Sequence, residues 1–184
     1  YHHMADHRFR GHCNEGAEYQ GCMQETIDFY AKQECNVYMI EFDNPRVYYD
    51  QYYNHWNNTA NREPEPVHPD TVLQWKRQCE VEIAKRGLIF QDMGHGWTAE
   101  PFGIDTSWGW IGRPDQEIPE ESRDFVAMMN GKRKLFNDIA LNTNVCMSNP
   151  KTREIMAKYI ADYAETQNNV DFLHIWLADG YNNH

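Results

Sequence analysis

Carboxylate, amide, aromatic and histidine side chains follow each of four short apolar runs in the sequence. They are Asn14 and Glu15, then Glu41, Asp43 and Asn44, then Asp92, His95 and Trp97, and finally Asp179, Asn182, Asn183 and His184. If the runs are parallel strands, their carboxyl ends meet at one edge of the sheet, where α/β proteins bind ligands. Two carboxyl groups that flank a glycosidic bond hydrolyse it, one as the acid and the other as nucleophile or base. The strand ends carry the carboxylates that such chemistry needs, among them Asp179, Glu41 and Glu15.

Aromatic residues make up 14% of the sequence, and many of them fall outside the apolar stripes of helices. Exposed tryptophan and tyrosine rings often form binding surfaces, and the C–H faces of sugars suit flat apolar rings. In the fourth apolar run, alternation places Phe172, His174 and Trp176 on one face of a strand. In a barrel His174 and Trp176 would point inward, and Trp176 is a substrate-binding candidate.

Helices and strands alternate along the chain and are expected to position these strand ends. Helices are expected at residues 23–33 and 70–86 and after Ser148-Asn149-Pro150, and strands at residues 9–13, 37–42, 88–93 and 170–177. The helices show apolar positions at helical spacing, and proline suits the first turn of the second and third. The order β-α-β-α-β-α-β predicts parallel strands joined by helical crossovers, and therefore an α/β fold.

A long insertion, about residues 98–147, separates the third strand from the third helix. Within it, segments 125–129 and 132–136 flank Asn130-Gly131, a dipeptide that predicts a β-hairpin. Residues 48–66 are rich in Asn, Tyr and Pro and are expected to form a long loop after the second strand.

The length of the chain suits one domain but is short for a complete barrel. A closed eight-stranded α/β barrel normally needs about 250 residues, whereas this sequence has 184. We therefore predict a single α/β domain, residues 1–184, that is the N-terminal half of a TIM-type barrel with a hairpin insertion. Such a half leaves strand edges unpaired, which predicts either a homodimer or a longer chain that supplies the rest of the barrel.

Composition excludes several classes of partner. A net charge of −11 without a cluster of Lys and Arg argues against nucleic acid. No apolar run is long enough to cross a membrane, and the N-terminus lacks the layout of a signal peptide, so we expect a soluble protein, cytoplasmic or secreted. The 5 cysteines are odd in number and form no CxxC pair, which predicts reduced thiols.

Four segments share their order and spacing with a known group of barrels. They are Arg10-Gly11, Met39-Ile-Glu-Phe-Asp43, Arg86-Gly87 leading to Asp92-Met-Gly-His95, and Ser148-Asn149-Pro150 leading to Asp171-Phe-Leu-His-Ile-Trp-Leu-Ala-Asp-Gly180. These segments resemble the first four strands of β-N-acetylhexosaminidase-like barrels. With its Asn130-Gly-Lys-Arg133 hairpin, the chain resembles still more closely a bacterial family of glycoside-hydrolase-like barrels with α-glucuronidase-type relatives. The resemblance covers nearly all of the chain and implies a carbohydrate substrate and no cofactor.

The resemblance also implies roles for individual residues. In hexosaminidases the fourth strand ends in adjacent Asp and Glu, and here Ala178 and Asp179 stand at these positions. Asp179 is therefore the implied general acid, while Ala178 argues against substrate-assisted hydrolysis of N-acetyl sugars. The partner carboxylate is left open among Glu15, Glu41, Asp43 and residues beyond His184. The substrate-binding candidates are the polar and aromatic residues at the strand ends: His95, Trp97, Asp43, Trp176, Asn182 and Asn183.

Two other functions fit the same strand ends. Glu, Asp and His at successive ends also describe the divalent-metal site of sugar isomerase-like barrels, with His95, Asp92, Glu41 or His184 as ligands. The leading hypothesis, in contrast, requires no metal. A non-catalytic carbohydrate-binding domain is the other alternative, because Ala178 removes one of the two expected carboxylates.

Overall fold

The computed structural model describes residues 7–15, 21–41 and 67–180, and the long loop expected at residues 48–66 lies outside them. The chain forms two compact units. Unit 1 comprises Tyr1–Met93 and Asn169–His174, and unit 2 comprises Gly94–Asn168 and Ile175–His184. The predicted insertion, residues 98–147, therefore lies wholly within unit 2.

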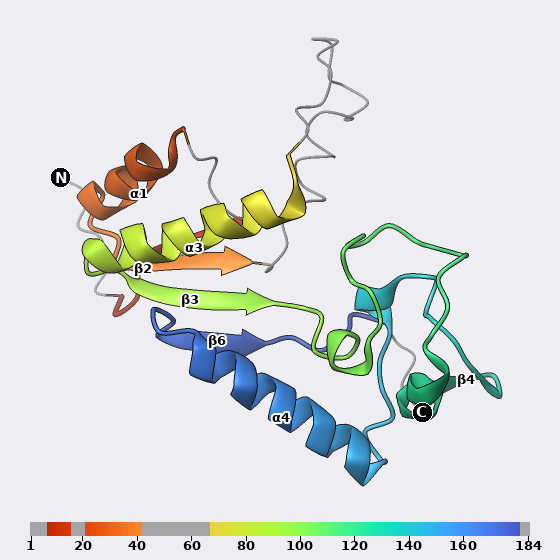
Figure 1. Ribbon diagram of the computed structural model, residues 1–184. Helices are drawn as coiled ribbons and strands as arrows, with labels where there is room; N and C mark the ends of the chain where they lie inside the picture. The colour runs from red at the N-terminus through yellow and green to blue at the C-terminus, as the bar shows by residue number, and fades with distance from the viewer. Residues whose placement is uncertain (1–6, 16–20, 42–66, 181–184) are drawn as a thin grey trace. The chain divides into compact units, whose positions relative to one another are not determined.

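The centre of unit 1 is a sheet of four strands. They are β1 (Gly11–Glu15), β2 (Val37–Glu41), β3 (Ile89–Gly94) and β6 (Phe172–Ile175), in the order β1-β2-β3-β6. β1 pairs with β2, and β2 with β3, in parallel, and β6 points the same way in Figure 1. The predicted α/β fold with a parallel sheet is confirmed. Among the described residues β1 and β6 are the two edges of this sheet, so no barrel is closed.

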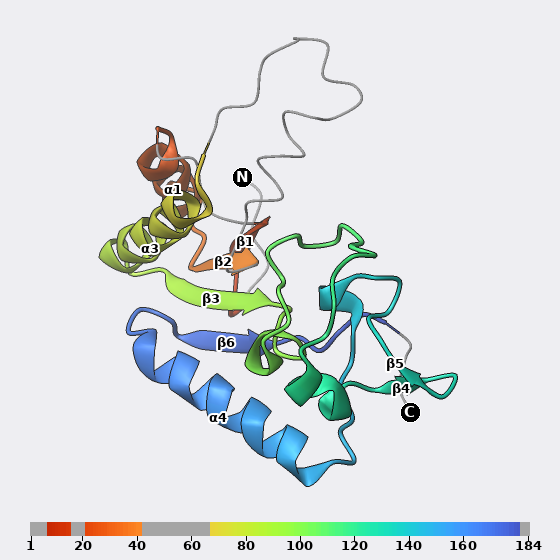
Figure 2. The same ribbon diagram turned by 45° about the vertical axis from the view of Figure 1, so that its right-hand side comes forward.

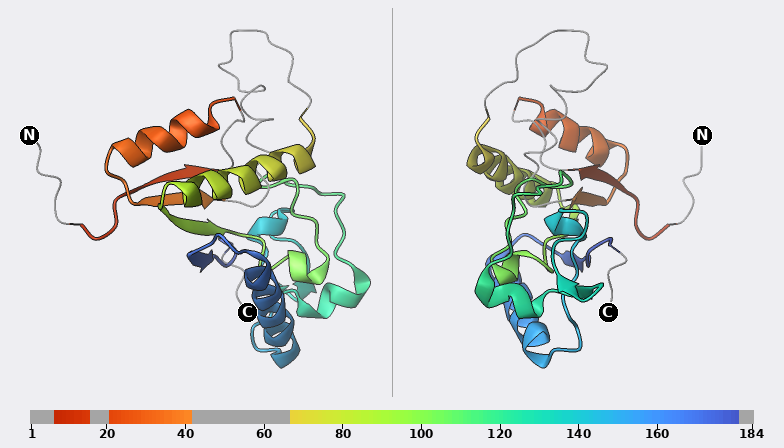
Figure 3. Two further views of the ribbon diagram at one scale, coloured as in Figure 1. Left: turned by 60° about the vertical axis from the view of Figure 1, so that its left-hand side comes forward. Right: turned by 90° about the vertical axis from the view of Figure 1, so that its right-hand side faces the viewer.

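Two helices cover one face of the sheet. α1 (Met23–Lys32) and α3 (Pro69–Lys85) lie on the same side of β1, β2 and β3 (Figures 1 and 3). The side chain of His68 caps α3 by accepting a hydrogen bond from the Asp70 backbone N–H at 3.2 Å. Both helices lie within one residue of their predicted bounds. Their apolar stripes and the strands form one core: Met23, Ile27, Tyr38, Ile40, Val72, Trp75, Cys79, Ile83, Leu88 and Phe90.

The first strand begins two residues later than predicted because a side chain holds the preceding segment. Asn36 donates to the Arg8 carbonyl and accepts from the Arg10 N–H, both at 2.8 Å. The Arg10 carbonyl also accepts from the Asn36 and Val37 backbone N–H groups at 2.8 and 3.1 Å, so Arg8 to Arg10 are held beside Asn36 before β1 begins at Gly11. A Cβ atom on Gly11 would lie 2.7 Å from the carbonyl oxygen of Val37, so only glycine lets β1 approach β2 this closely. The Arg10-Gly11 motif thus has a structural role here.

A buried ion pair joins α3 to β3. Lys76 is 0% exposed, and its Nζ lies 2.9 Å from Oδ1 of Asp92, which is 3% exposed. Asp92 pairs in register with the core residue Ile40, so its side chain is on the helix-covered face of the sheet. Glu80, one turn after Lys76 and 4% exposed, accepts a hydrogen bond from Arg77. The core of unit 1 therefore contains buried charged groups whose burial is offset by neighbours of opposite charge.

The Glu80 carboxyl is expected to make the folding stability depend on pH. Burial raises its pKa above the ordinary value of 4.5, although Arg77 and Lys76 act to lower it. Above that ordinary value the unfolded chain loses this proton more readily than the folded chain, so the free energy of unfolding falls as the pH rises through the folded pKa. We expect Glu80→Gln to gain stability relative to the wild type from about pH 4 to about pH 7, measured by urea unfolding.

Glu82 provides the matched control, two residues further along α3. Hydrogen bonds from Arg86 and Lys85 lower its pKa. The stability that Glu82 contributes is therefore present above its ordinary pKa and is lost as the pH falls through the folded pKa. Glu82→Gln should lose stability relative to the wild type toward neutral pH, opposite to Glu80→Gln. If the two variants show the same pH trend, the assigned environment of Glu80 is wrong.

The other face of the sheet presents polar side chains. Gln91 on β3 and His174 on β6 are hydrogen-bonded, with 2.8 Å between Oε1 and Nε2. Alternate residues of a strand share one face of the sheet, and so do register partners on neighbouring strands. Met39 pairs with Gln91 and Glu41 with Met93, so Met39 and Glu41 lie on this same face. This is the face that would line the interior if the sheet belonged to a barrel.

Unit 2 consists mainly of loops around short elements. They are η1 (Glu100–Phe102), η2 (Glu120–Phe125), β4 (Met128–Met129), β5 (Lys132–Arg133), η3 (Ala140–Asn142) and α4 (Pro150–Thr166). The predicted hairpin is present as β4 and β5 (Figure 2), with Asn130 and Gly131 both at positive φ. Its strands are shorter than predicted because Val126 bridges to Val145 and Phe136 to Ile139. Asn149 caps α4, as predicted, by accepting from the Lys151 N–H.

None of the helices described in either unit is long and apolar enough to span a bilayer.

Candidate functional site

The segment that follows β3 places His95 in unit 2. Gly94, the last residue of β3, accepts hydrogen bonds through its carbonyl from the Trp176 backbone N–H at 3.2 Å and the Trp97 ring N–H at 2.9 Å. Gly96 has φ of 113°, a value that L side chains rarely adopt, and a Cβ there would lie 2.8 Å from Glu100 Oε1. Glycine at position 96 is thus required for the turn that orients His95.

The imidazole of His95 is held in one orientation. Its side chain is 6% exposed, and its Nδ1 lies 2.7 Å from the carbonyl oxygen of Leu177. Because a carbonyl oxygen only accepts hydrogen bonds, Nδ1 must carry the hydrogen, which leaves Nε2 as the nitrogen that gains or loses a proton. That Nε2 lies 3.8 Å from Oδ1 of Asp179. The separation exceeds a direct hydrogen bond and suits an ion pair when His95 is protonated.

Two tryptophan rings pack against His95. The Trp110 ring centroid is 5.1 Å from that of His95 with an angle of 80° between the planes, and for Trp176 the values are 5.4 Å and 65°. Both tryptophans are half-buried. Edge-to-face contacts of this kind favour a fixed mutual orientation of the rings. Two tryptophan rings therefore flank the nearly buried side chain of His95.

Asp179 lies at the exposed end of this cluster. Its side chain is 66% exposed, and the next residue, Gly180, accepts a hydrogen bond through its carbonyl from Asn144 Nδ2 at 2.8 Å. Asn144 is itself buried, so this bond fixes the end of the loop that bears Asp179. The carboxylate of Asp179 is therefore exposed to solvent, whereas the backbone that follows it is held in place.

Three predicted site residues thus come together in unit 2: His95, Trp176 and Asp179. Trp110 was not among the substrate-binding candidates, although the sequence offered it, with Trp97 and Trp108, as a possible lining residue of a cleft at the strand ends. It lies within the insertion, far from the strand ends in sequence. Contact between the insertion and the strand ends is a tertiary property that no local pattern encodes.

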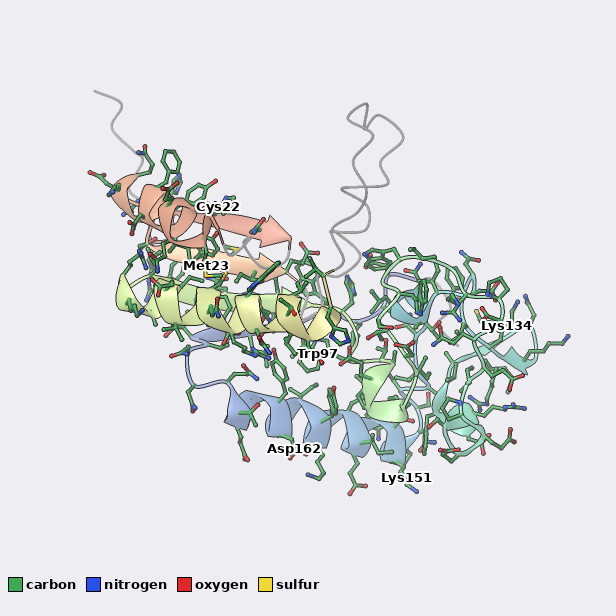
Figure 4. All side chains as sticks on the ribbon, turned by 45° about the horizontal axis from the view of Figure 1, so that its top comes forward. Cys22, Met23, Trp97, Lys134, Lys151 and Asp162 are labelled. Carbon is green, nitrogen blue, oxygen red and sulfur yellow. The ribbon has the colours of Figure 1, made fainter. Side chains whose placement is uncertain are left out.

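Trp97 has a different position from the one predicted. It is 8% exposed, its ring N–H is bonded to the Gly94 carbonyl, and its ring packs against Tyr159 and Tyr163 of α4 at 6.1 and 5.3 Å. Trp97 is labelled in Figure 4. Such burial leaves the Trp97 ring little surface with which to contact a sugar, so its observed role is in the core of unit 2.

The predicted carboxylates Glu15 and Glu41 belong to unit 1. They end β1 and β2 and are direct partners in the strand register. The strand register therefore brings the backbones of these two catalytic candidates together. The candidates Asp43, Asn182 and Asn183 lie outside the described residues.

The metal-site alternative used a partly different set of residues. Of its ligands, Asp92 is ion-paired to Lys76 in the core of unit 1, and His184 lies outside the described residues. Within residues 7–15, 21–41 and 67–180 there is no group of three or more His, Cys, Asp or Glu side chains arranged to hold a metal ion.

The fold and the site define a mixed α/β protein with a histidine, tryptophan and aspartate cluster in one of its two units. Comparison of the chain with protein-family models, with curated proteins and with solved structures finds no match.

Proposed function

We propose that this chain is the first half of a glycoside-hydrolase-like barrel and that it binds a glycan at the cluster of His95, Trp110, Trp176 and Asp179. The half-barrel is supported by four parallel strands with helices between the first three, the order in which barrels of this kind are built. The edges at β1 and β6 offer backbone to further strands, from a second copy or from a longer chain.

The cluster in unit 2 is the observation on which the glycan proposal depends. Flat apolar rings bind the C–H faces of sugars, while a carboxylate binds their hydroxyl groups. Trp110 and Trp176 supply the rings, and the exposed carboxylate of Asp179 supplies the polar atoms. His95, whose side chain is 6% exposed, packs between these groups, with its Nε2 3.8 Å from Asp179.

Asp179 is the proposed general acid if the chain is a hydrolase. In that role it would donate a hydrogen to the glycosidic oxygen as the bond to the anomeric carbon breaks. His95, with its hydrogen fixed on Nδ1, turns its second nitrogen toward Asp179. The partner carboxylate that attacks or activates water stays open among Glu15, Glu41, Asp43 and residues beyond His184.

A non-catalytic glycan-binding domain is the second candidate. The exposure of Asp179, 66%, favours it, because a general acid is usually shielded from water whereas a hydrogen-bond acceptor for sugar hydroxyls is not. In this case the same residues bind the glycan and no bond is broken.

Glycan binding is tested with an array of oligosaccharides. The array should carry glucose, N-acetylglucosamine, xylose, mannose, galacturonic acid and glucuronic acid oligomers of increasing length. We expect the wild type to retain at least one series and Trp176→Ala to weaken it by about tenfold or more, because one stacking ring is lost. Phe172→Ala is the matched control, since Phe172 lies on the same strand segment but in unit 1 and is 47% exposed. Equal retention by wild type and Trp176→Ala would contradict the assigned site.

A further inference from the structure

The loop of residues 105–116 presents a second tryptophan that the proposed site does not use. Trp108 is 37% exposed, and the guanidinium carbon of Arg113 lies 4.4 Å from the centroid of its ring. Arg113 is held in turn by Asp115, to which its Nε and Nη2 donate at 2.9 and 2.7 Å. A cation stacked on a ring and fixed by a two-point ion pair holds that ring in place.

The backbone of this loop is also braced. The Arg113 N–H donates to the Asp138 carbonyl at 2.7 Å, and the Gln116 side chain donates to the Asp105 carbonyl at 2.8 Å. A turn closes before Gly109, whose N–H bonds to Thr106 at 2.9 Å. An exposed ring on a rigid loop loses little conformational freedom when it binds a ligand, which favours binding.

Trp108 lies two residues before Trp110, which belongs to the proposed site. Trp110 contacts His95, and two residues span at most about 7 Å. A ligand of more than one sugar ring can therefore occupy the His95 cluster and reach Trp108 as well. An exposed ring among polar neighbours suits the same apolar sugar faces as Trp110 and Trp176.

The charges beside Trp108 do not favour an anion. Hydrogen bonds from Arg113 lower the pKa of Asp115 to about 2, so this pair stays ionised above that pH. Asp105 adds a further carboxylate that acts on Arg113, so no positive charge is left over to bind an anionic sugar. The surroundings of Trp108 thus favour uncharged sugar units.

We propose that Trp108 is a second sugar-stacking position, and that the glycan bound by this chain is a neutral oligosaccharide of more than one unit. This inference rests on the proposed glycan function and adds the length and charge of the ligand. Trp108 acts as a binding residue, with Arg113 and Asp115 as the groups that position its ring.

The test compares short and long members of the glycan series that the wild type retains, by isothermal titration calorimetry. We expect wild-type affinity to rise from the single sugar to the hexamer of a neutral series. Trp108→Ala should weaken binding of the hexamer by about tenfold and leave the single sugar unchanged. Trp176→Ala should weaken both, and Trp108→Phe, which keeps a ring, should retain most of the hexamer affinity.

Several outcomes overturn the inference. If Trp108→Ala weakens both lengths equally or neither, or if only uronic acid series are bound, the second position or its neutral ligand is wrong while the glycan function stands. If Trp108→Ala changes only self-association in light scattering, the ring is instead part of a protein interface. If the wild type retains no series, the proposed function fails, and this inference fails with it.

Discussion

Replacing Lys76 by methionine is expected to lower the free energy of unfolding by about 3–5 kcal/mol at neutral pH. Methionine matches the apolar stem of lysine but removes the ammonium group that lies 2.9 Å from Asp92. Asp92 and Glu80 then remain as buried carboxylates, with only Arg77 as an opposite charge among the groups that act on Glu80. Removing the ammonium group is costly because the interior solvates the remaining carboxylates poorly.

The same substitution at Lys158 is the matched control. Lys158 lies 2.7 Å from Asp162 on α4, but its side chain is 74% exposed and that of Asp162 is 59% exposed. Figure 4 labels Asp162 on α4. Exposed pairs contribute little, so Lys158→Met should change stability by no more than about 0.5 kcal/mol. Urea unfolding of both variants measures the difference.

The pH dependence of Lys76→Met makes the test specific. Lys76 acts to lower the pKa of Glu80, so in the variant Glu80 takes up its proton at a higher pH and the deficit relative to the wild type should shrink toward about pH 4. A loss of stability that is the same at both pH values would indicate a packing defect rather than the loss of a charge interaction. A loss below about 1 kcal/mol at neutral pH would contradict the buried ion pair.

Replacing Asp179 by asparagine is expected to slow hydrolysis of a bound glycan by about 10²–10⁴-fold, if the chain is the proposed hydrolase. Asparagine keeps the shape and an acceptor oxygen but cannot supply a proton. Binding of the glycan should therefore persist while bond cleavage is lost. The measurement is release of reducing ends from the series that the array identifies, together with calorimetric affinity.

Asp162→Asn is the control, because Asp162 is also exposed and belongs to the same unit, yet lies on α4 in a simple ion pair. It should leave the rate unchanged. Glu41→Gln and Glu15→Gln identify the partner carboxylate, and the one that lowers the rate without lowering affinity is that partner. If the wild type binds a glycan but releases no reducing ends, the non-catalytic candidate replaces the hydrolase. An unchanged rate in Asp179→Asn would exclude Asp179 as the acid.

Local patterns in the sequence were enough to predict the three long helices and the order of the strands between them. The stripe that includes Val72, Cys79 and Ile83 predicted α3 because helical spacing requires one buried face. Asn149 followed by proline predicted the start of α4, since these residues satisfy the first helical N–H groups. The order of strands and helices then fixed their parallel pairing.

The hairpin shows where such patterns fall short. Asn130-Gly131 specified the turn correctly because both residues tolerate positive φ. The length of the strands depended instead on which partners Val126 and Phe136 found, and both paired elsewhere within unit 2. Pairing between distant segments is decided by the packing of the whole unit.

For the candidate site, the sequence by itself determined which residue types stand at the ends of the strands. The tertiary structure decided which of them meet. It gathered His95, Trp176 and Asp179 with Trp110 from the insertion, buried Trp97, and directed Asp92 into the core against Lys76. The physical reason is that adjacent residues of a strand point to opposite faces, and that contacts across long loops depend on closure and packing, which local sequence does not encode.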